Sequence, residues 1–189
     1  AKGIAFGRRL DATVEEPDVF PLAVQGPKAE TLMTGLFGDG IAALPYFGFG
    51  TFDVLGTRQV IARSGYSKQG GFEIYLEGGH LGGALWDLVW EAGRGLEIRP
   101  GCPNLIERIE GGLMSYGNEF TRANNPLECG FKRYCHLEDG IDYIGRKALL
   151  KIAEDGPDRH IMGVKFGGEP LSGVAFPLAV MAADGTQVG

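Results

Sequence analysis

Apolar and polar residues alternate from 72 to 76 and predict a half-buried β-strand. Phe72, Ile74 and Leu76 alternate with Glu73 and Tyr75, which is the period of two residues expected of a strand. Glu73 and Tyr75 therefore share one face of the strand. A glycine-rich turn leads directly into it, and glycine permits a positive φ or a close approach of the backbone. We expect the face that carries Glu73 to open at this turn.

The same patterning predicts further elements on both sides of this strand. Strands are expected at 20–25, 51–55 and 58–62, with a short one at 97–99. Helices are expected from Pro27 to a stop at Gly38, at 81–92, from Pro103 to about 114, and at 144–153. Antiparallel hairpins without repeated βαβ units indicate an α+β fold.

The third predicted helix has an apolar stripe that we expect to be buried: Leu105, Ile106, Ile109, Leu113 and Met114. Arg108 lies at the edge of this stripe, from where its side chain can reach into a cavity. A guanidinium is suited to bidentate contact with a carboxylate. That carboxylate belongs either to a ligand or to a neighbouring element in a structural ion pair, and the sequence leaves both open.

A change of pattern near residue 155 predicts a domain boundary. The segment 155–158, Asp-Gly-Pro-Asp, is the best linker, and a β-rich segment is expected to start at 161–166. The Asp184-Gly185 turn near the end of the chain indicates a hairpin that loses its second strand. We therefore expect domains at 1–154 and 159–189. Because the chain begins with Ala1 and ends mid-pattern, we interpret it as an internal piece of a larger protein.

Composition and charge narrow the class of protein. With 189 residues, 44% of them hydrophobic and 22% charged, the chain is typical of soluble globular proteins. The net charge of −6 argues against nucleic acid or an anionic membrane as a general partner. Cys102, Cys129 and Cys135 cannot all pair, which favours reduced thiols in a cytoplasm. The three histidines are scattered without ligand spacing, so no metal site is expected.

Four stretches, in order along the chain, match motifs of one family. Leu22 to Ala29 is similar to "LALQGPKA", Gly65 to Glu73 to "GYTGEDGFE", Arg108 to Asn118 to "RLEAGLxLYGN", and Tyr143 to Leu149 to "FIGREAL". On these motifs the chain resembles the glycine-cleavage T-protein (aminomethyltransferase) superfamily of tetrahydrofolate-dependent one-carbon transferases. Within it, the stretches SKQGG and GCPNLIERIE look more similar to the dimethylsulfoniopropionate demethylases of marine bacteria.

The resemblance implies an antiparallel-sheet, folate-binding core with helices, incomplete at its N-terminus, followed by the start of a small C-terminal β-barrel. It implies transfer of a methyl group from a small sulfonium, dimethylsulfoniopropionate-like, or methylamine donor to tetrahydrofolate. An aminomethyltransferase of the glycine cleavage system is the alternative, and it would need a lipoyl carrier protein as partner. An alternative of another class is a folate-binding module without turnover.

The resemblance also assigns roles around the pterin ring of the folate. Glu73 would hold the ring through its amino group and ring N–H, because a carboxylate accepts two parallel hydrogen bonds well. Tyr66 would stack on the ring or form a wall beside it, and Tyr75 would line the same pocket. Arg108 would contact the folate tail or an acidic substrate. For Tyr66, packing on the sheet is the structural alternative.

Two further positions differ from the T-protein pattern beside the expected pocket. Lys68 and Gln69 replace its "GE" pair, so the resemblance places them at the substrate. Lys68 would attract the carboxylate of a small zwitterionic substrate, and an exposed turn lysine is the alternative. The catalytic aspartate of the superfamily precedes the part covered by this chain. No catalytic residue is therefore assigned, and a fragment without that aspartate would be inactive.

Overall fold

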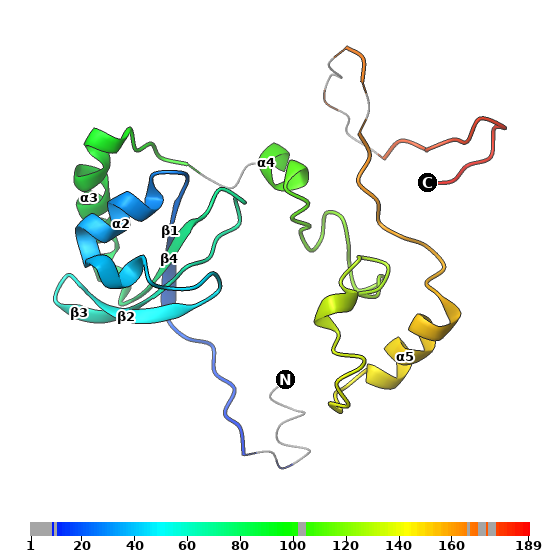
Figure 1. Ribbon diagram of the computed structural model, residues 1–189, viewed down its shortest axis with the longest axis horizontal. Coiled ribbons are helices and arrows are strands. Elements are labelled where there is room, and N and C mark those ends of the chain that lie inside the picture. The colour runs from blue at the N-terminus through cyan, green and yellow to red at the C-terminus, as the bar shows by residue number, and fades with distance from the viewer. Residues whose placement is uncertain (1–8, 10, 102–104, 166, 170–172, 174–176) are drawn as a thin grey trace. The chain divides into compact units, whose positions relative to one another are not determined.

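The computed structural model describes residues 9, 11–101, 105–165, 167–169, 173 and 177–189 (Figure 1). The chain divides into two compact units, Ala1–Thr121 and Arg122–Gly189. Each unit is described by itself. The boundary expected between 154 and 159 stays a prediction. Among the described residues, no helix has the length and apolar character needed to cross a membrane.

The first unit is built on a four-stranded antiparallel sheet. Its strands are β1 (Val19–Gln25), β2 (Phe49–Val54), β3 (Thr57–Ala62) and β4 (Gly71–Glu77), in the order β1-β4-β3-β2. The four strands predicted at 20–25, 51–55, 58–62 and 72–76 are confirmed. The combination of helices with an antiparallel sheet also confirms the α+β fold class.

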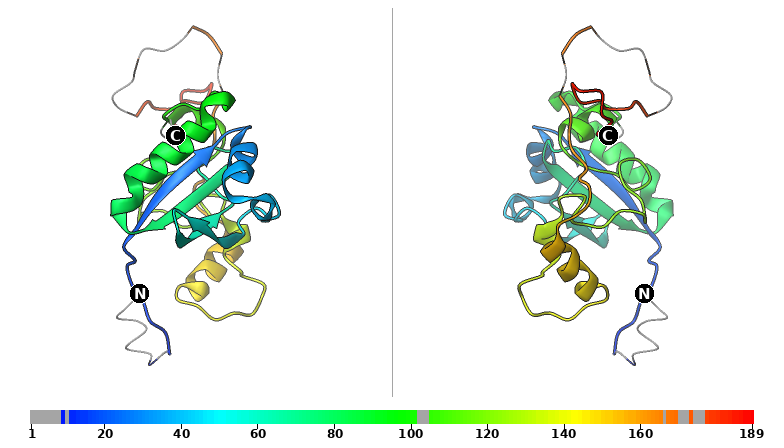
Figure 2. Two further views of the ribbon diagram at one scale, coloured as in Figure 1. Left: turned by 90° about the vertical axis from the view of Figure 1, so that its left-hand side faces the viewer. Right: turned by 90° about the vertical axis from the view of Figure 1, so that its right-hand side faces the viewer.

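Two helices cover one face of this sheet (Figure 1; Figure 2, left). They are α2 (Ala29–Phe37) and α3 (Gly82–Gly93). Phe72, Ile74 and Leu76 of β4 are buried in the core against them. Because side chains alternate along a strand, Glu73 and Tyr75 lie on the opposite face of the sheet, as predicted.

The start of α2 and the segment after α3 differ from the sequence predictions. Helix α2 begins at Ala29 rather than Pro27, which lies in the preceding turn, and Gly38 ends it with φ 83°. The strand expected at 97–99 is wrong. The Ile98 N–H instead bonds the Gly93 carbonyl at 3.2 Å and closes the end of α3, so this segment pairs with no strand.

Helix α4 (Leu105–Glu110) is shorter than predicted, and its orientation differs. Ile106 and Ile109, which were predicted to be buried, are 68% and 60% exposed, whereas Arg108 is only 4% exposed, so the prediction is wrong for these two isoleucines. Leu113 and Met114 are half-buried, and the side chain of Leu105 lies outside the description. Two backbone bonds explain the early end: the Gly112 N–H donates to the Ile109 carbonyl and the Leu113 N–H to the Arg108 carbonyl. With Gly112 at φ 67°, this is a Schellman cap. Pro103 and Cys102 lie outside the described residues.

The second unit has a small core of its own. Helix α5 (Arg146–Asp155) confirms the helix predicted at 144–153, and its Leu149 and Ile152 pack on a cluster of buried residues: Leu127, Cys135 and Leu137. Residues 161–165 form no strand; the Ile161 N–H instead bonds the Glu128 carbonyl at 2.9 Å. The expected turn near 184 is present, because Met181 pairs with Gln187 across it in an antiparallel bridge.

Candidate functional site

Glu73 lies on the central strand β4 in an open part of the sheet. Its cross-strand neighbours are Ala23 on β1 and Ala62 on β3, two small residues that leave space around the carboxylate. Its Oε2 accepts hydrogen bonds from the Ser64 hydroxyl at 2.5 Å and the Tyr75 hydroxyl at 3.3 Å. Among the described residues, no group bonds Oε1. One carboxylate oxygen is therefore held by the protein and the other is free to accept from a ligand.

Tyr75 remains protonated beside this carboxylate. Burial raises the pKa of the Tyr75 hydroxyl, and the negative charge of Glu73 raises it further. The hydroxyl thus stays a hydrogen-bond donor across the neutral pH range. Tyr75 therefore lies on the same face as Glu73, as predicted. It is not among the described residues that line the cavity at the glycine turn, so its place in a ligand pocket stays a prediction.

Gln25 holds the glycine-rich turn in place. Its amide donates to the Ser64 carbonyl at 3.0 Å and the Phe72 carbonyl at 3.2 Å, and its oxygen accepts from the Ser67 hydroxyl at 2.8 Å. A Cβ on Gly65 would lie 2.0 Å from the Gln25 amide oxygen. This close approach requires glycine at position 65, and it fixes the turn above Glu73.

A cavity of about 270 Å³ lies at this turn. Its described lining consists of Ala23, Gln25, Tyr66, Ser67, Gln69, Glu73, Arg99, Gly101 and Glu107. The structure thus brings together three of the predicted residues: Glu73, Tyr66 and Gln69. Sequence reasoning missed Gln25 and Arg99. The only local signal for Gln25 was its position in the "LALQGPKA" motif.

Tyr66 and Gln69 connect the turn to the α4 segment. The Tyr66 hydroxyl donates to the carbonyls of Leu113 at 3.1 Å and Met114 at 2.7 Å. The Gln69 amide donates to Glu107 at 3.2 Å. The Tyr66 ring therefore forms a wall of the cavity, and its hydroxyl proton is shared between these two carbonyls.

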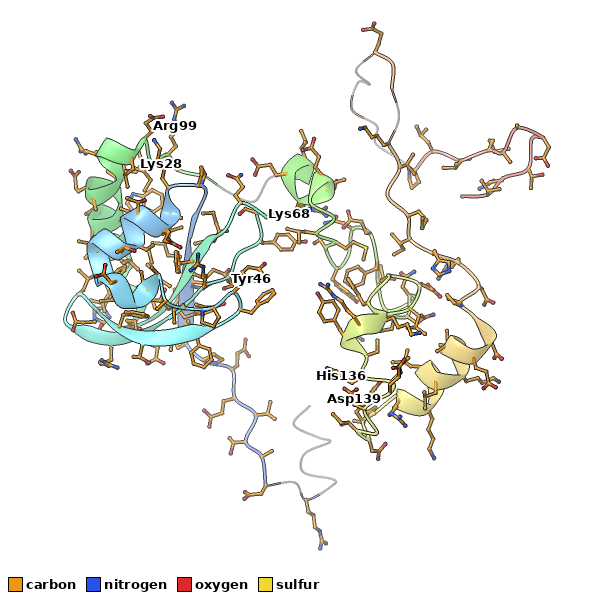
Figure 3. The ribbon with its side chains drawn as sticks, in the orientation of Figure 1. Lys28, Tyr46, Lys68, Arg99, His136 and Asp139 are labelled. Atoms are coloured by element: carbon orange, nitrogen blue, oxygen red, sulfur yellow. The ribbon has the colours of Figure 1, made fainter. Side chains whose placement is uncertain are left out.

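Lys68 has an exposed side chain and a backbone in the left-handed region, with φ 58° (Figure 3). It does not appear among the described residues that line the cavity. A contact between Lys68 and a substrate stays a prediction. The contact predicted for Gln69 with a substrate stays one as well.

Arg108 forms a buried ion pair with Glu119. Its two terminal nitrogens contact the two carboxylate oxygens at 2.7 and 3.0 Å, and Glu119 also accepts from the Ser115 N–H at 2.7 Å. The hydrogen bond from Arg108 lowers the pKa of Glu119, and the same bond raises the pKa of Arg108. Of the two possibilities open from the sequence, the ion pair is present. Contact of Arg108 with a ligand stays a prediction.

Comparison with known proteins supports the resemblance seen in the motifs. Residues 5–139 match the family described as the GCVT N-terminal domain. The chain is 50% identical over 188 residues to the dimethylsulfoniopropionate demethylase DmdA of Ruegeria pomeroyi, covering 99% of this chain and 50% of that protein. It is 36% identical over 177 residues to an aminomethyltransferase of Symbiobacterium thermophilum, covering 90% and 47%.

An aminomethyltransferase of Thermoanaerobacter sp. is 35% identical over 150 residues, covering 77% of this chain and 40% of that protein. The chain thus spans about half the length of the curated relatives it matches. The resemblance inferred from four short motifs is confirmed by identity over most of the chain. On these matches, the chain belongs to the GCVT N-terminal domain family.

Proposed function

We propose that this chain is the folate-binding part of a tetrahydrofolate-dependent methyltransferase. The donor would be a small sulfonium compound resembling dimethylsulfoniopropionate, or a methylamine. The observation that carries the proposal is the Glu73 carboxylate, which lines a cavity. One of its oxygens is held by Ser64 and Tyr75, and the other has no donor among the residues that the structure describes. Support for the donor comes from the demethylase that is 50% identical over 99% of the chain.

The free oxygen of Glu73 suits the edge of a pterin ring. A 2-amino-pyrimidinone edge offers two parallel N–H donors. Glu73 can accept one at Oε1, and the other at Oε2 in place of the long 3.3 Å bond from the Tyr75 hydroxyl. Tyr66 would lie beside the ring as a wall. Tetrahydrofolate would supply the nucleophilic nitrogen, N5. The part played by these residues is to hold that ligand in one orientation.

Such a transfer needs no covalent intermediate on the protein. The methyl carbon forms a bond to N5 as its bond to sulfur or nitrogen breaks, and the electron pair of that bond leaves with the donor. N5 then loses its proton to solvent, which gives 5-methyltetrahydrofolate. Holding the nucleophile and the methyl group in line is worth about 7–11 kcal/mol in well-oriented systems. Aromatic walls hold a cationic donor at about 0.5–2 kcal/mol per contact.

An aminomethyltransferase is the second candidate, favoured by the relatives of that name at 35% and 36% identity. It would require a lipoyl carrier protein as partner. A cytoplasmic location and the start of a C-terminal β-barrel after residue 159 stay predictions that accompany both candidates.

One experiment separates these functions. The full-length protein is supplied with tetrahydrofolate and dimethylsulfoniopropionate, and 5-methyltetrahydrofolate is measured by chromatography. We expect product without any carrier protein. If product forms only from an aminomethyl-lipoyl carrier protein, with release of ammonia, the second candidate is correct. If tetrahydrofolate binds but neither donor nor methylated amines react, the protein is a folate-binding module.

A further inference from the structure

A second cavity adjoins the one at Glu73. It has a volume of about 300 Å³ and lies between β1 and α3, where Trp86, Val89 and Trp90 line it. Four residues line both cavities: Ala23, Gln25, Arg99 and Gly101. The two cavities therefore share a rim at the edge strand β1 and Arg99, with Glu73 on one side and the tryptophans of α3 on the other. We call the two cavities together the trough.

The two residues before Arg99, Glu97 and Ile98, both contact the rest of the first unit. The Ile98 N–H bonds the Gly93 carbonyl at 3.2 Å, and the Ile98 side chain packs against the main core. Glu97 forms an ion pair with Lys28 at 3.3 Å, and Figure 3 shows Lys28 and Arg99 at the same end of the first unit. These contacts fix the place of Arg99 at the rim of the trough.

The Arg99 guanidinium has no partner among the described residues, in contrast to three other arginines of this unit. Within the part of the chain that the structure describes, no hydrogen bond or ion pair involves its guanidinium. Arg63, Arg94 and Arg108 each pair with a glutamate. The described lining of the trough otherwise carries two charged groups, Glu73 and Glu107, both acidic. Arg99 is therefore the one described cation positioned to receive an anion there.

We propose that Arg99 binds a carboxylate of the glutamate tail of tetrahydrofolate while Glu73 holds the pterin at the other end of the trough. This rests on the proposed function. A guanidinium forms bidentate hydrogen bonds with carboxylates. Trp86 and Trp90, stacked with ring centroids 6.4 Å apart and planes 6° apart, give the far part of the trough an aromatic surface. Because Glu119 already occupies the Arg108 guanidinium, Arg99 suits the tail better than Arg108.

The test compares two ligands on three forms of the full-length protein. Calorimetry measures the affinity of tetrahydrofolate and of tetrahydropterin, which lacks the aminobenzoyl-glutamate tail. The forms are wild type, Arg99→Gln and Arg94→Gln. Arg94 is a matched control because it is exposed, pairs with Glu91 and lies five positions away outside both linings.

We expect Arg99→Gln to weaken tetrahydrofolate binding about fivefold, a size suited to an ion pair at an exposed rim. Tetrahydropterin binding should not change, and Arg94→Gln should resemble wild type. If Arg99→Gln leaves tetrahydrofolate affinity unchanged, or weakens both ligands equally, the tail contact is refuted while the pterin site stands. If wild type binds neither ligand, the proposed function itself is refuted.

Discussion

The two oxygens of the Glu73 carboxylate lie in different surroundings. Oε2 accepts from Ser64 and Tyr75, whereas Oε1 faces no donor among the described residues. The alternation at 72–76 was enough to predict the face on which Glu73 lies. The contact with Ser64 could not be predicted, because it spans nine positions across a turn whose path depends on Gln25 and the glycines. A local pattern contains no information about such a path.

Replacing Glu73 tests this arrangement directly. Glu73→Gln should weaken tetrahydrofolate binding to the full-length protein by about 1.5–3 kcal/mol, because an amide cannot accept at both positions and a charge-assisted pair is lost. Calorimetry measures the change. Glu77→Gln is a suitable control, since Glu77 is an exposed residue at the end of the same strand. Equal affinities of wild type and Glu73→Gln would remove Glu73 from the site.

Helix α4 shows how a single long-range pair decides the orientation of a short element. The apolar spacing predicted a long helix with Ile106 and Ile109 inside, but the buried side chain is Arg108. Its partner Glu119 lies eleven positions further along the chain, beyond the cap at Gly112. The hydrophobic pattern describes preferences within the helix, so it could not include this contact.

Substitutions of Ile109 and Ile74 compare an exposed isoleucine of a helix with a buried isoleucine of a strand. Ile109→Ala should change the free energy of unfolding by no more than about 0.5 kcal/mol, because its side chain is 60% exposed. Ile74→Ala should lower it by about 2–5 kcal/mol, because Ile74 is fully buried against α2 and α3. Urea unfolding of the chain measures both. A large loss for Ile109→Ala would show that α4 buries this face after all.

The Arg108–Glu119 pair should make stability depend on pH. Arg108 lowers the pKa of Glu119 in the folded state, so the unfolded state binds more protons as the pH falls. The stabilisation is complete above the ordinary glutamate pKa of about 4.3 and is lost as the pH falls through the lower folded value. The Tm of wild type should therefore exceed that of Glu119→Gln at pH 7, and the gap should shrink below about pH 4.

Differential scanning calorimetry across this pH range gives the comparison. Glu91→Gln removes a partner of an exposed arginine, Arg94, and should leave Tm almost unchanged at every pH. A gap between wild type and Glu119→Gln that stays constant down to low pH would contradict the assignment of the effect to the Glu119 charge.

At the scale of the whole chain, the sequence pattern predicted where the four strands lie but not the order in which they pair. The order β1-β4-β3-β2 places Gln25 opposite Gly71, two residues that are far apart in the sequence. This pairing brings the "LALQGPKA" and glycine-turn motifs together at Glu73. Arg99 was missed because residues 97–99 were predicted as a strand. In the structure this segment instead closes the end of α3 and carries Arg99 to the trough.

The two compact units should differ in stability. The first has a core of a sheet and two helices, whereas the described core of the second consists of five residues: Leu127, Cys135, Leu137, Leu149 and Ile152. Less apolar surface is thus buried in the second unit, and it should unfold at a lower urea concentration. Both tryptophans of the chain, Trp86 and Trp90, belong to α3 in the first unit.

Tryptophan fluorescence therefore reports on the first unit alone, whereas far-ultraviolet circular dichroism also detects α5. We expect the dichroism signal to begin its loss at lower urea than the fluorescence signal. Leu149→Ala should shift only this early phase, and Ile74→Ala should shift the fluorescence transition, because each residue packs in a different core. Coincident curves from the two probes would instead mean that the chain unfolds as one cooperative unit, since that coincidence is the mark of a two-state transition.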